Sequence, residues 1–90
     1  MKVTVTETVE HSADITPEMI EAYIKRNGWV VCYDGPLTTS WNQGSGTYTL
    51  TLDKNQGDTE TCDLRRALET ISWQEARQPH FVLAEIAGGT

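Results

Sequence analysis

The chain has 90 residues, which is enough for one small domain with a single modest hydrophobic core. Hydrophobic residues make up 38% of the chain and charged residues 22%, a composition that fits a folded globular domain better than a disordered tail. Seven Lys and Arg residues against thirteen Asp and Glu residues give a formal net charge of -6, which disfavours direct binding to the phosphates of nucleic acids.

The N-terminal segment KVTVTETV, residues 2–9, alternates apolar and polar residues as a half-buried strand does. The apolar positions on its inner face are Val3, Val5 and Val9. The following HSAD, residues 11–14, breaks this alternation. No signal-peptide core is found in this region, and no later stretch has the roughly 18 apolar residues of a membrane span. We therefore expect a soluble, cytoplasmic protein in which residues 1–90 form a single domain.

Residues 15–28 carry the strongest helix signals of the chain. Thr16 can cap the helix, Pro17 suits the first helical position, and Asn27-Gly28 supplies a left-handed stop. The apolar stripe between these signals consists of Met19, Ile20, Tyr23 and Ile24. We therefore expect a helix over residues 17–27 that packs through this stripe.

Three strands are expected after this helix. Residues 29–34, WVVCYD, are apolar on both faces, which indicates a central strand. A short strand near residues 38–42 follows a turn, and residues 47–53, TYTLTLD, alternate with Tyr48 pointing inward. We expect these three strands to form an antiparallel meander.

Two helices close the chain. A polar loop, residues 54–61, ends near the start of the second helix. The candidate caps of that helix are Asp58, Thr59 and Thr61. Pro79 and Gly88 then suit the start and the stop of a short third helix. The expected order is β-α-β-β-β-α-α, an α+β fold in which an antiparallel sheet, made of the three-stranded meander plus the N-terminal strand, packs against helices.

The second helix, which includes RRALETISWQEA at residues 65–76, has two faces of different character. At roughly 100° per residue, one face consists of Leu64, Ala67, Leu68 and Ile71. The opposite face consists of Cys62, Arg66, Glu69 and Trp73. Trp73 therefore shares its side of the helix with charged residues. Burying an indole is worth about 2 to 3 kcal/mol, so we expect something to cover this ring.

Two interpretations of what covers Trp73 remain. The chain itself could fold back over the ring, or a partner could bind there. Because Trp and Arg are enriched among binding hot spots, the second interpretation makes Trp73, Glu69 and Arg66 a candidate protein-interaction site. Trp41 stands in the polar strand TTSWNQ and either packs across to a tyrosine or adds to the same contact surface.

No catalytic, cofactor or metal site is predicted. His11 lies in an expected loop and His80 at a helix start, and neither is near Cys32 or Cys62 in the sequence. The spacing of these residues matches no zinc motif, and without a secretion signal we expect free thiols instead of a disulfide. The GSG at residues 44–46 lacks the lysine and the helix of a phosphate-binding loop and predicts a hairpin turn.

Residues 15–29, ITPEMIEAYIKRNGW, and residues 63–88, DLRRALETISWQEARQPHFVLAEIAG, together resemble short proteins of phages and other mobile elements. In those proteins a similar helix runs into a tryptophan strand, and a closing helix pair ends in a PxxVLxxI-like turn. The residues of this chain at that pattern are Pro79, Val82, Leu83 and Ile86. The resemblance is carried mostly by core positions, so it implies the fold more than the activity, and no functional residue carries over.

Small acidic phage proteins of this kind include inhibitors of bacterial immune systems, such as anti-CRISPR proteins, which occupy a surface of a larger host complex. The resemblance therefore implies a non-enzymatic inhibitor that binds a host protein or ribonucleoprotein defence complex through an acidic and aromatic face. From the net charge and the lack of a long apolar stretch, we expect neither direct nucleic-acid binding nor a membrane span. The alternative is a structural or regulatory homodimer, in which the N-terminal strand or the second helix pairs with its twin.

Overall fold

The computed structural model describes residues 1–44, 46, 48–55, 57 and 59–88. Its strands are β1 (Lys2–Thr6), β2 (Glu10–Asp14), β3 (Trp29–Asp34), β4 (Thr38–Gln43) and β5 (Leu50–Asp53). Its helices are α1 (Pro17–Arg26), α2 (Thr61–Glu75) and α3 (Pro79–Gly88). The predicted α+β class and the predicted order of elements are confirmed, and the structure adds β2 to them. Thr47 of the expected third meander strand and the candidate cap Asp58 lie outside the described residues.

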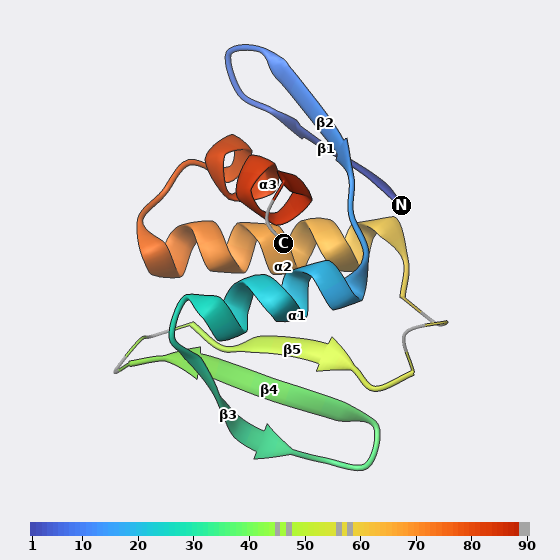
Figure 1. The fold of residues 1–90 in the computed structure, drawn as a ribbon, viewed down its shortest axis with the longest axis vertical. Coiled ribbons are helices and arrows are strands. Elements are labelled where there is room, and N and C mark those ends of the chain that lie inside the picture. The colour runs from blue at the N-terminus through green and yellow to red at the C-terminus, as the bar shows by residue number, and fades with distance from the viewer. Residues whose placement is uncertain (45, 47, 56, 58, 89–90) are drawn as a thin grey trace.

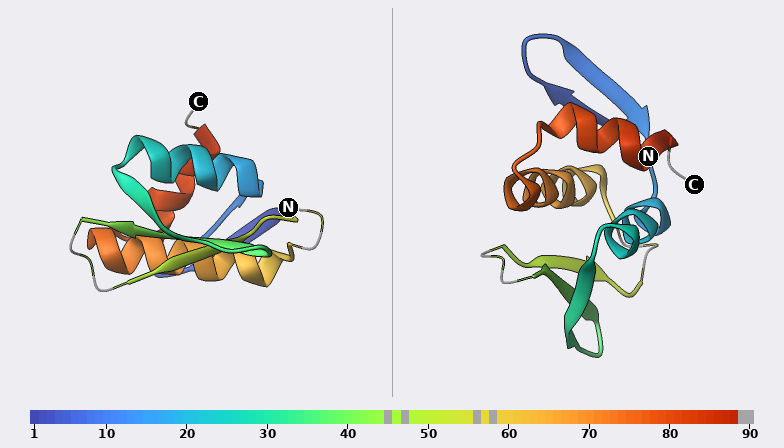
Figure 2. Two further views of the ribbon diagram at one scale, coloured as in Figure 1. Left: turned by 90° about the horizontal axis from the view of Figure 1, so that it is seen from below. Right: turned by 60° about the vertical axis from the view of Figure 1, so that its left-hand side comes forward.

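The helices lie between two antiparallel sheets (Figures 1 and 2). On one side the β1-β2 hairpin packs against α2 and α3, and on the other side the sheet β3-β4-β5 packs against α1 and α2. The N-terminal strand therefore pairs with β2 in a sheet of its own, instead of joining the meander as its additional strand. Among the described residues, no helix is both long and apolar enough to cross a bilayer.

The hairpin partner β2 contains Glu10, His11, Ser12, Ala13 and Asp14, the segment in which the sequence predicted a loop. Its residues pair with β1 from Lys2 opposite Asp14 to Thr6 opposite Glu10. His11 and Ala13 are the half-buried positions of this strand, and its other residues are exposed. Burial alternates with a period of two, but the half-buried positions are a histidine and an alanine. A search for alternating apolar residues therefore does not predict this strand. Val9, expected on the inner face, lies outside β1 and is 63% exposed.

Helix α1 forms as its local signals predict. The hydroxyl of Thr16 accepts a hydrogen bond from the backbone N–H of Met19 at 3.3 Å, and Pro17 occupies the first turn. Asn27 caps the end, and Gly28 follows with a φ of +82°. The helix ends at Arg26, one residue before the predicted end. Its buried residues are Ile20, Tyr23 and Ile24.

Helix α2 starts at a different cap from those predicted. Its N-cap is Glu60, whose backbone N–H donates to the carboxylate of Asp63 at 3.0 Å. Thr61 is the first residue of the helix, and Thr59 is buried just before the cap. The reciprocal pairing of positions Ncap and N3 therefore takes the place of a threonine cap.

Strand β3 is an edge strand, so the prediction that it is central is wrong. The hydrogen-bonded order is β3-β4-β5, which places β4 in the middle. Only Trp29 of β3 is buried, whereas Val30, Val31 and Tyr33 are 59%, 48% and 58% exposed. A register shift between Val31 and Tyr33 also interrupts the simple alternation of side chains between the two faces of the strand. The apolar residues on both faces of β3 are therefore mostly exposed at the edge of the sheet and do not indicate a central strand.

The hydrophobic core fills the space between the helices and both sheets. From α2 it takes the predicted leucine face, in which Leu64, Leu68 and Ile71 are at most 1% exposed. Its remaining members are Val3, Val5, Ile15, Ile20, Tyr23, Ile24, Trp29, Trp41, Leu50, Ala67, Val82, Leu83 and Ile86. The core therefore fixes the rotation of α2 about its axis, and with it the direction of Trp73.

Candidate protein-interaction surface

Trp73 lies on the outer face of α2 and is 58% exposed. This placement confirms the helical rotation inferred from the sequence. The third helix does not cover the ring, because α3 contributes its buried residues to the core on the other side of α2. Partial cover comes from Tyr48, whose ring centroid is 5.8 Å from that of Trp73. More than half of the side chain therefore stays open to solvent.

Tyr48 belongs to the surface around Trp73, although the sequence predicted that it points inward. It is 41% exposed, and its backbone N–H donates to Gln74 Oε1 at 3.3 Å. Gly46 lies so close to the amide of Gln74 that a Cβ there would collide with it. Gln74 thus fixes the chain before β5 against α2, and this contact sets the Tyr48 ring beside Trp73.

A shallow groove continues this surface along α2. Arg66 and Thr70 line it from the helix, and Thr49 and Thr51 line it from the neighbouring chain at β5, with a volume of about 330 Å³. Positions 66, 70 and 73 follow one another at helical spacing, so they form a continuous strip in which Arg66 and Trp73 are exposed and Thr70 is half-buried. We call Arg66, Thr70, Trp73 and Tyr48 the α2 surface.

Glu69 does not lie in the groove of the α2 surface. It is half-buried and lines a separate hollow beside β1, together with Arg65 and Pro79. The sequence had grouped Glu69 with Arg66 and Trp73 because a helical projection separates only two sides. The structure divides the polar side further, since β1 packs next to one part of it and β5 next to the other.

Trp41 is a core residue, and its assignment to the contact surface is corrected. It is 6% exposed, and among the described residues its Nε1 has no hydrogen-bond acceptor. One edge of the side chain borders a groove of about 460 Å³ between α1 and the sheet, which Lys25 and Val31 also line. Trp41 is in the central strand β4, whose inner face the helices cover, and this burial separates it from Trp73.

The C-terminal turn of α2, which carries Trp73, is fixed by the carboxylate of Glu75. Tyr23 Oη donates to Glu75 Oε1 at 2.5 Å, and Trp29 Nε1 donates to Oε2 at 2.9 Å. The Glu75 side chain is 7% exposed, so water competes little for these bonds. Arg77 Nη1 also donates to Tyr23 Oη at 2.9 Å. These hydrogen bonds therefore hold in place the helix end that carries the exposed indole.

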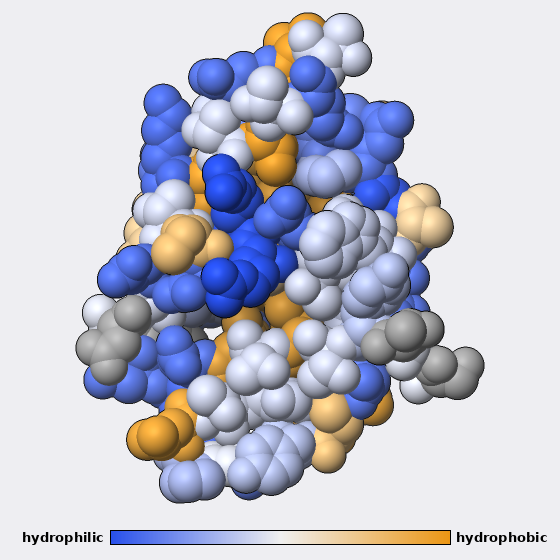
Figure 3. Space-filling view, turned by 180° about the vertical axis from the view of Figure 1, so that it is seen from behind, coloured by the Kyte–Doolittle hydropathy of each residue, from blue (hydrophilic) through white to orange (hydrophobic). Residues whose placement is uncertain are grey.

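A second apolar area, missed by the sequence analysis, lies on the β3-β4 hairpin. Its exposed residues are Val30, Val31, Tyr33 and Leu37, and Leu37 is 76% exposed. Seen from behind, hydrophobic side chains reach the surface at the lower end of the molecule, where this hairpin lies (Figure 3). The signal in the sequence was the run of apolar residues, but only the strand order shows that they are uncovered.

One group of side chains could hold a metal ion. They are Glu7 and His11 of the N-terminal hairpin region and the distant His80, and their ligand atoms lie within 4.8 Å of one another. The expectation that the chain has no metal site relied on spacing along the sequence, which does not report this proximity.

Comparison with known protein families, with curated protein sequences and with solved structures found no match to this chain. The α+β fold, the α2 surface and the side-chain clusters are therefore the observations from which its function has to follow.

Proposed function

We propose that this protein is a non-enzymatic binding domain that inhibits a host defence complex by occupying one of its surfaces. The observation that carries the proposal is Trp73, which is 58% exposed on a helix end that buried hydrogen bonds hold in place. A large rigid aromatic side chain loses little entropy on binding and brings much apolar area, which is why Trp is enriched among hot spots.

The partner that we propose has a basic surface of the kind that holds nucleic acid. The chain carries a net charge of -6, so its field attracts a positively charged protein and repels nucleic acid itself. Ribonucleoprotein defence complexes bind their nucleic acids through Lys and Arg, as counterion release requires. Net charge would then guide the encounter, and the α2 surface would supply the apolar contact.

The proposal assigns no nucleophilic role to the two cysteines. A nucleophilic cysteine needs an adjacent base, most often a histidine. His11 and His80 stack on each other, and Glu7 contacts His80. Cys32 and Cys62 are exposed free thiols on β3 and at the start of α2.

The test is recovery of a partner from a lysate of the host, followed by affinity measurements with the purified complex. The proposal requires that the recovered partner is a nuclease or nucleic-acid-binding assembly whose activity the protein inhibits. Trp73→Ala should then weaken binding by about 2 kcal/mol, or about 30-fold in Kd. Tyr33→Ala is the matched control, because Tyr33 is equally exposed but lies on β3. Equal affinity of W73A and the parent protein would contradict the proposal.

A homodimer is the second candidate, and the edge strand β3 favours it. An edge strand has unpaired backbone N–H and C=O groups that can pair with another chain, and β3 adds exposed Val30, Val31 and Tyr33. In β1, which the sequence had suggested for pairing, Val3 and Val5 are buried. Sedimentation at increasing concentration should show a dimer that Val30→Lys abolishes. A 10.0 kDa species at every concentration would exclude it.

A further inference from the structure

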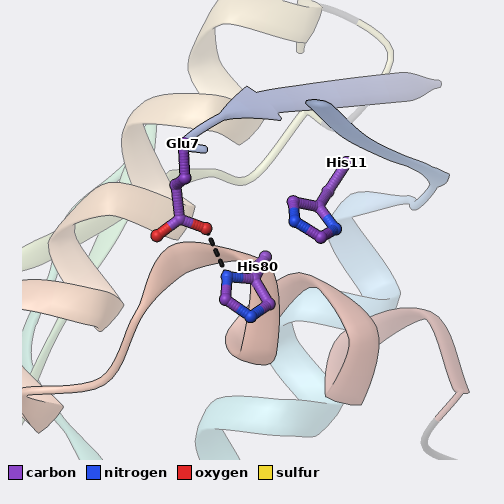
Figure 4. A group of neighbouring side chains, drawn as sticks. All are labelled: Glu7, His11 and His80. Carbon is purple, nitrogen blue, oxygen red and sulfur yellow. Dashed lines mark hydrogen bonds and ion pairs between the residues drawn. The ribbon is translucent and has the colours of Figure 1, made fainter. Parts of the chain in front are cut away.

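The hairpin β1-β2 and the start of α3 bring three ligating side chains together (Figure 4). Glu7 follows β1, His11 lies in β2, and His80 is the second residue of α3. The carboxylate of Glu7 contacts His80 Nδ1. The rings of His11 and His80 stack with their centroids 4.4 Å apart and their planes 13° from parallel. The ligand atoms of the three residues lie within 4.8 Å of one another.

We propose that Glu7, His11 and His80 bind a divalent transition-metal ion, with Zn²⁺ as the best match. Two imidazole nitrogens and one carboxylate oxygen are a common three-ligand set for zinc, which leaves a fourth position for water or for a group from a partner. Zinc takes such ligands at about 2.0 to 2.2 Å, so the side chains have to close around the ion. They can do so by rotation, because those of His80 and Glu7 are 24% and 27% exposed.

The hydrogen bonding of the cluster leaves the ring nitrogens of His11 unused. Glu7 pairs with one ring only, that of His80. Within the part of the chain that the structure describes, the nitrogens of His11 form no hydrogen bond, and its interaction is the stack on His80. A lone pair of His11 is therefore available, and a shared cation would give both rings and the carboxylate a common partner.

Metal binding at this position would join elements that are distant in the sequence. Glu7 and His80 are 73 positions apart, and the cluster lies where the hairpin packs on α3. An ion that binds only the folded form stabilises it by mass action, so zinc should raise the unfolding temperature. This inference concerns a different part of the molecule from the α2 surface and does not depend on the proposed function.

The first experiment uses NMR of the chain with Cys32→Ser and Cys62→Ser, because exposed thiols would themselves bind zinc. His11 and His80 are the only histidines of the chain, so their imidazole signals can be assigned to the cluster directly. Addition of ZnCl₂ should shift the signals of both rings and saturate at one ion per chain. Signals that do not move, or a shift of only one ring, would overturn the proposal.

The second experiment measures zinc affinity by calorimetry in the same background. His11→Ala, His80→Ala and Glu7→Gln should each weaken binding at least about tenfold and remove the zinc-dependent rise in unfolding temperature. Glu10→Gln is the matched control, since Glu10 is a carboxylate of the same hairpin outside the cluster. Circular dichroism without zinc shows whether each variant folds. Equal zinc affinity in the folded variants and the parent would show that the cluster is only a hydrogen-bonded clamp.

Discussion

Glu75 connects α2 to three other elements through one buried carboxylate. Tyr23 of α1 and Trp29 of β3 both donate to it, and Gln43 Nε2 of β4 adds a longer bond of 3.2 Å. A carboxylate without such donors would be costly at this depth, whereas here its oxygens have partners from three directions. The end of α2 that presents Trp73 is thus held by polar contacts as well as by the core.

Glu75→Ala should lower the free energy of unfolding by about 3 kcal/mol, because it leaves the buried donors of Tyr23 and Trp29 without an acceptor. Urea denaturation followed by circular dichroism measures this change. Glu18→Ala, at an exposed carboxylate of α1, should change stability by about 0.5 kcal/mol or less. A similarly small change for Glu75→Ala would mean that the network contributes little.

Tyr23 should make stability depend on alkaline pH. Burial, and secondly the hydrogen bond to the Glu75 carboxylate, raise the pKa of Tyr23 well above its ordinary value of 10.0. The folded state therefore holds this proton more tightly than the unfolded state. The resulting stabilisation is fully present below pH 10.0 and is lost as the pH rises through the raised pKa.

The measurement is the free energy of unfolding as a function of pH, for the parent protein and for Tyr23→Phe. Above about pH 10, the stability of the parent should fall more steeply than that of the variant, since the unfolded tyrosine releases its proton first. Parallel curves would show that the Tyr23 hydroxyl has no such role.

At the scale of elements, α2 ends in a strained residue. Ala76, the C-cap, has a φ of +54°, which is the left-handed conformation that favours glycine. Its backbone N–H donates to the carbonyl groups of Ser72 and Trp73, so the conformation is built into the end of the helix. Because α3 packs against α2 directly after this turn, the chain is held in the left-handed conformation at Ala76.

Ala76→Gly should therefore stabilise the protein by about 0.5 to 1 kcal/mol, because the relief of strain exceeds the added entropy of the unfolded glycine. Ala84→Gly in the body of α3 should destabilise it by about 1 kcal/mol, since φ there is helical. Thermal unfolding of both variants gives the comparison. Destabilisation in both would mean that Ala76 is not strained in solution.

At the scale of the whole molecule, the net charge of -6 and the exposed Trp73 of the α2 surface have separable effects on binding. If the partner is basic, its association rate should fall at least about tenfold between about 0.05 and 0.5 M salt, because screening removes the long-range attraction. Trp73→Ala should increase the dissociation rate at both salt concentrations. Surface plasmon resonance resolves the two rates. An association rate that is independent of salt would leave only the apolar contact.

Much of the local structure could be predicted from the sequence. The start and end of α1 follow from Thr16, Pro17 and Asn27, and the phase of α2 follows from the spacing of its leucines. The outward direction of Trp73 came from that same spacing. These features depend on contacts within a few residues or on a helical period, which the sequence displays directly.

Pairing and cover could not be predicted in the same way. Nothing in the local pattern of β3 says whether strands flank it on both sides, and β2 has a single aliphatic side chain, Ala13. The burial of Trp41 and the side of α2 that Glu69 occupies depend on which strands lie next to them. Each of these features depends on contacts with residues that are distant in the sequence.

By itself, the sequence determined the α+β class, the bounds of α1 to within one residue and the direction of Trp73, because capping and periodicity act over short distances. Only the tertiary structure decided that β3 lies at an edge, that Trp41 is enclosed and that Glu7 meets His80 and His11. Those contacts join residues up to 73 positions apart, and they form only when the packing of helices between two sheets brings the hairpin onto α3.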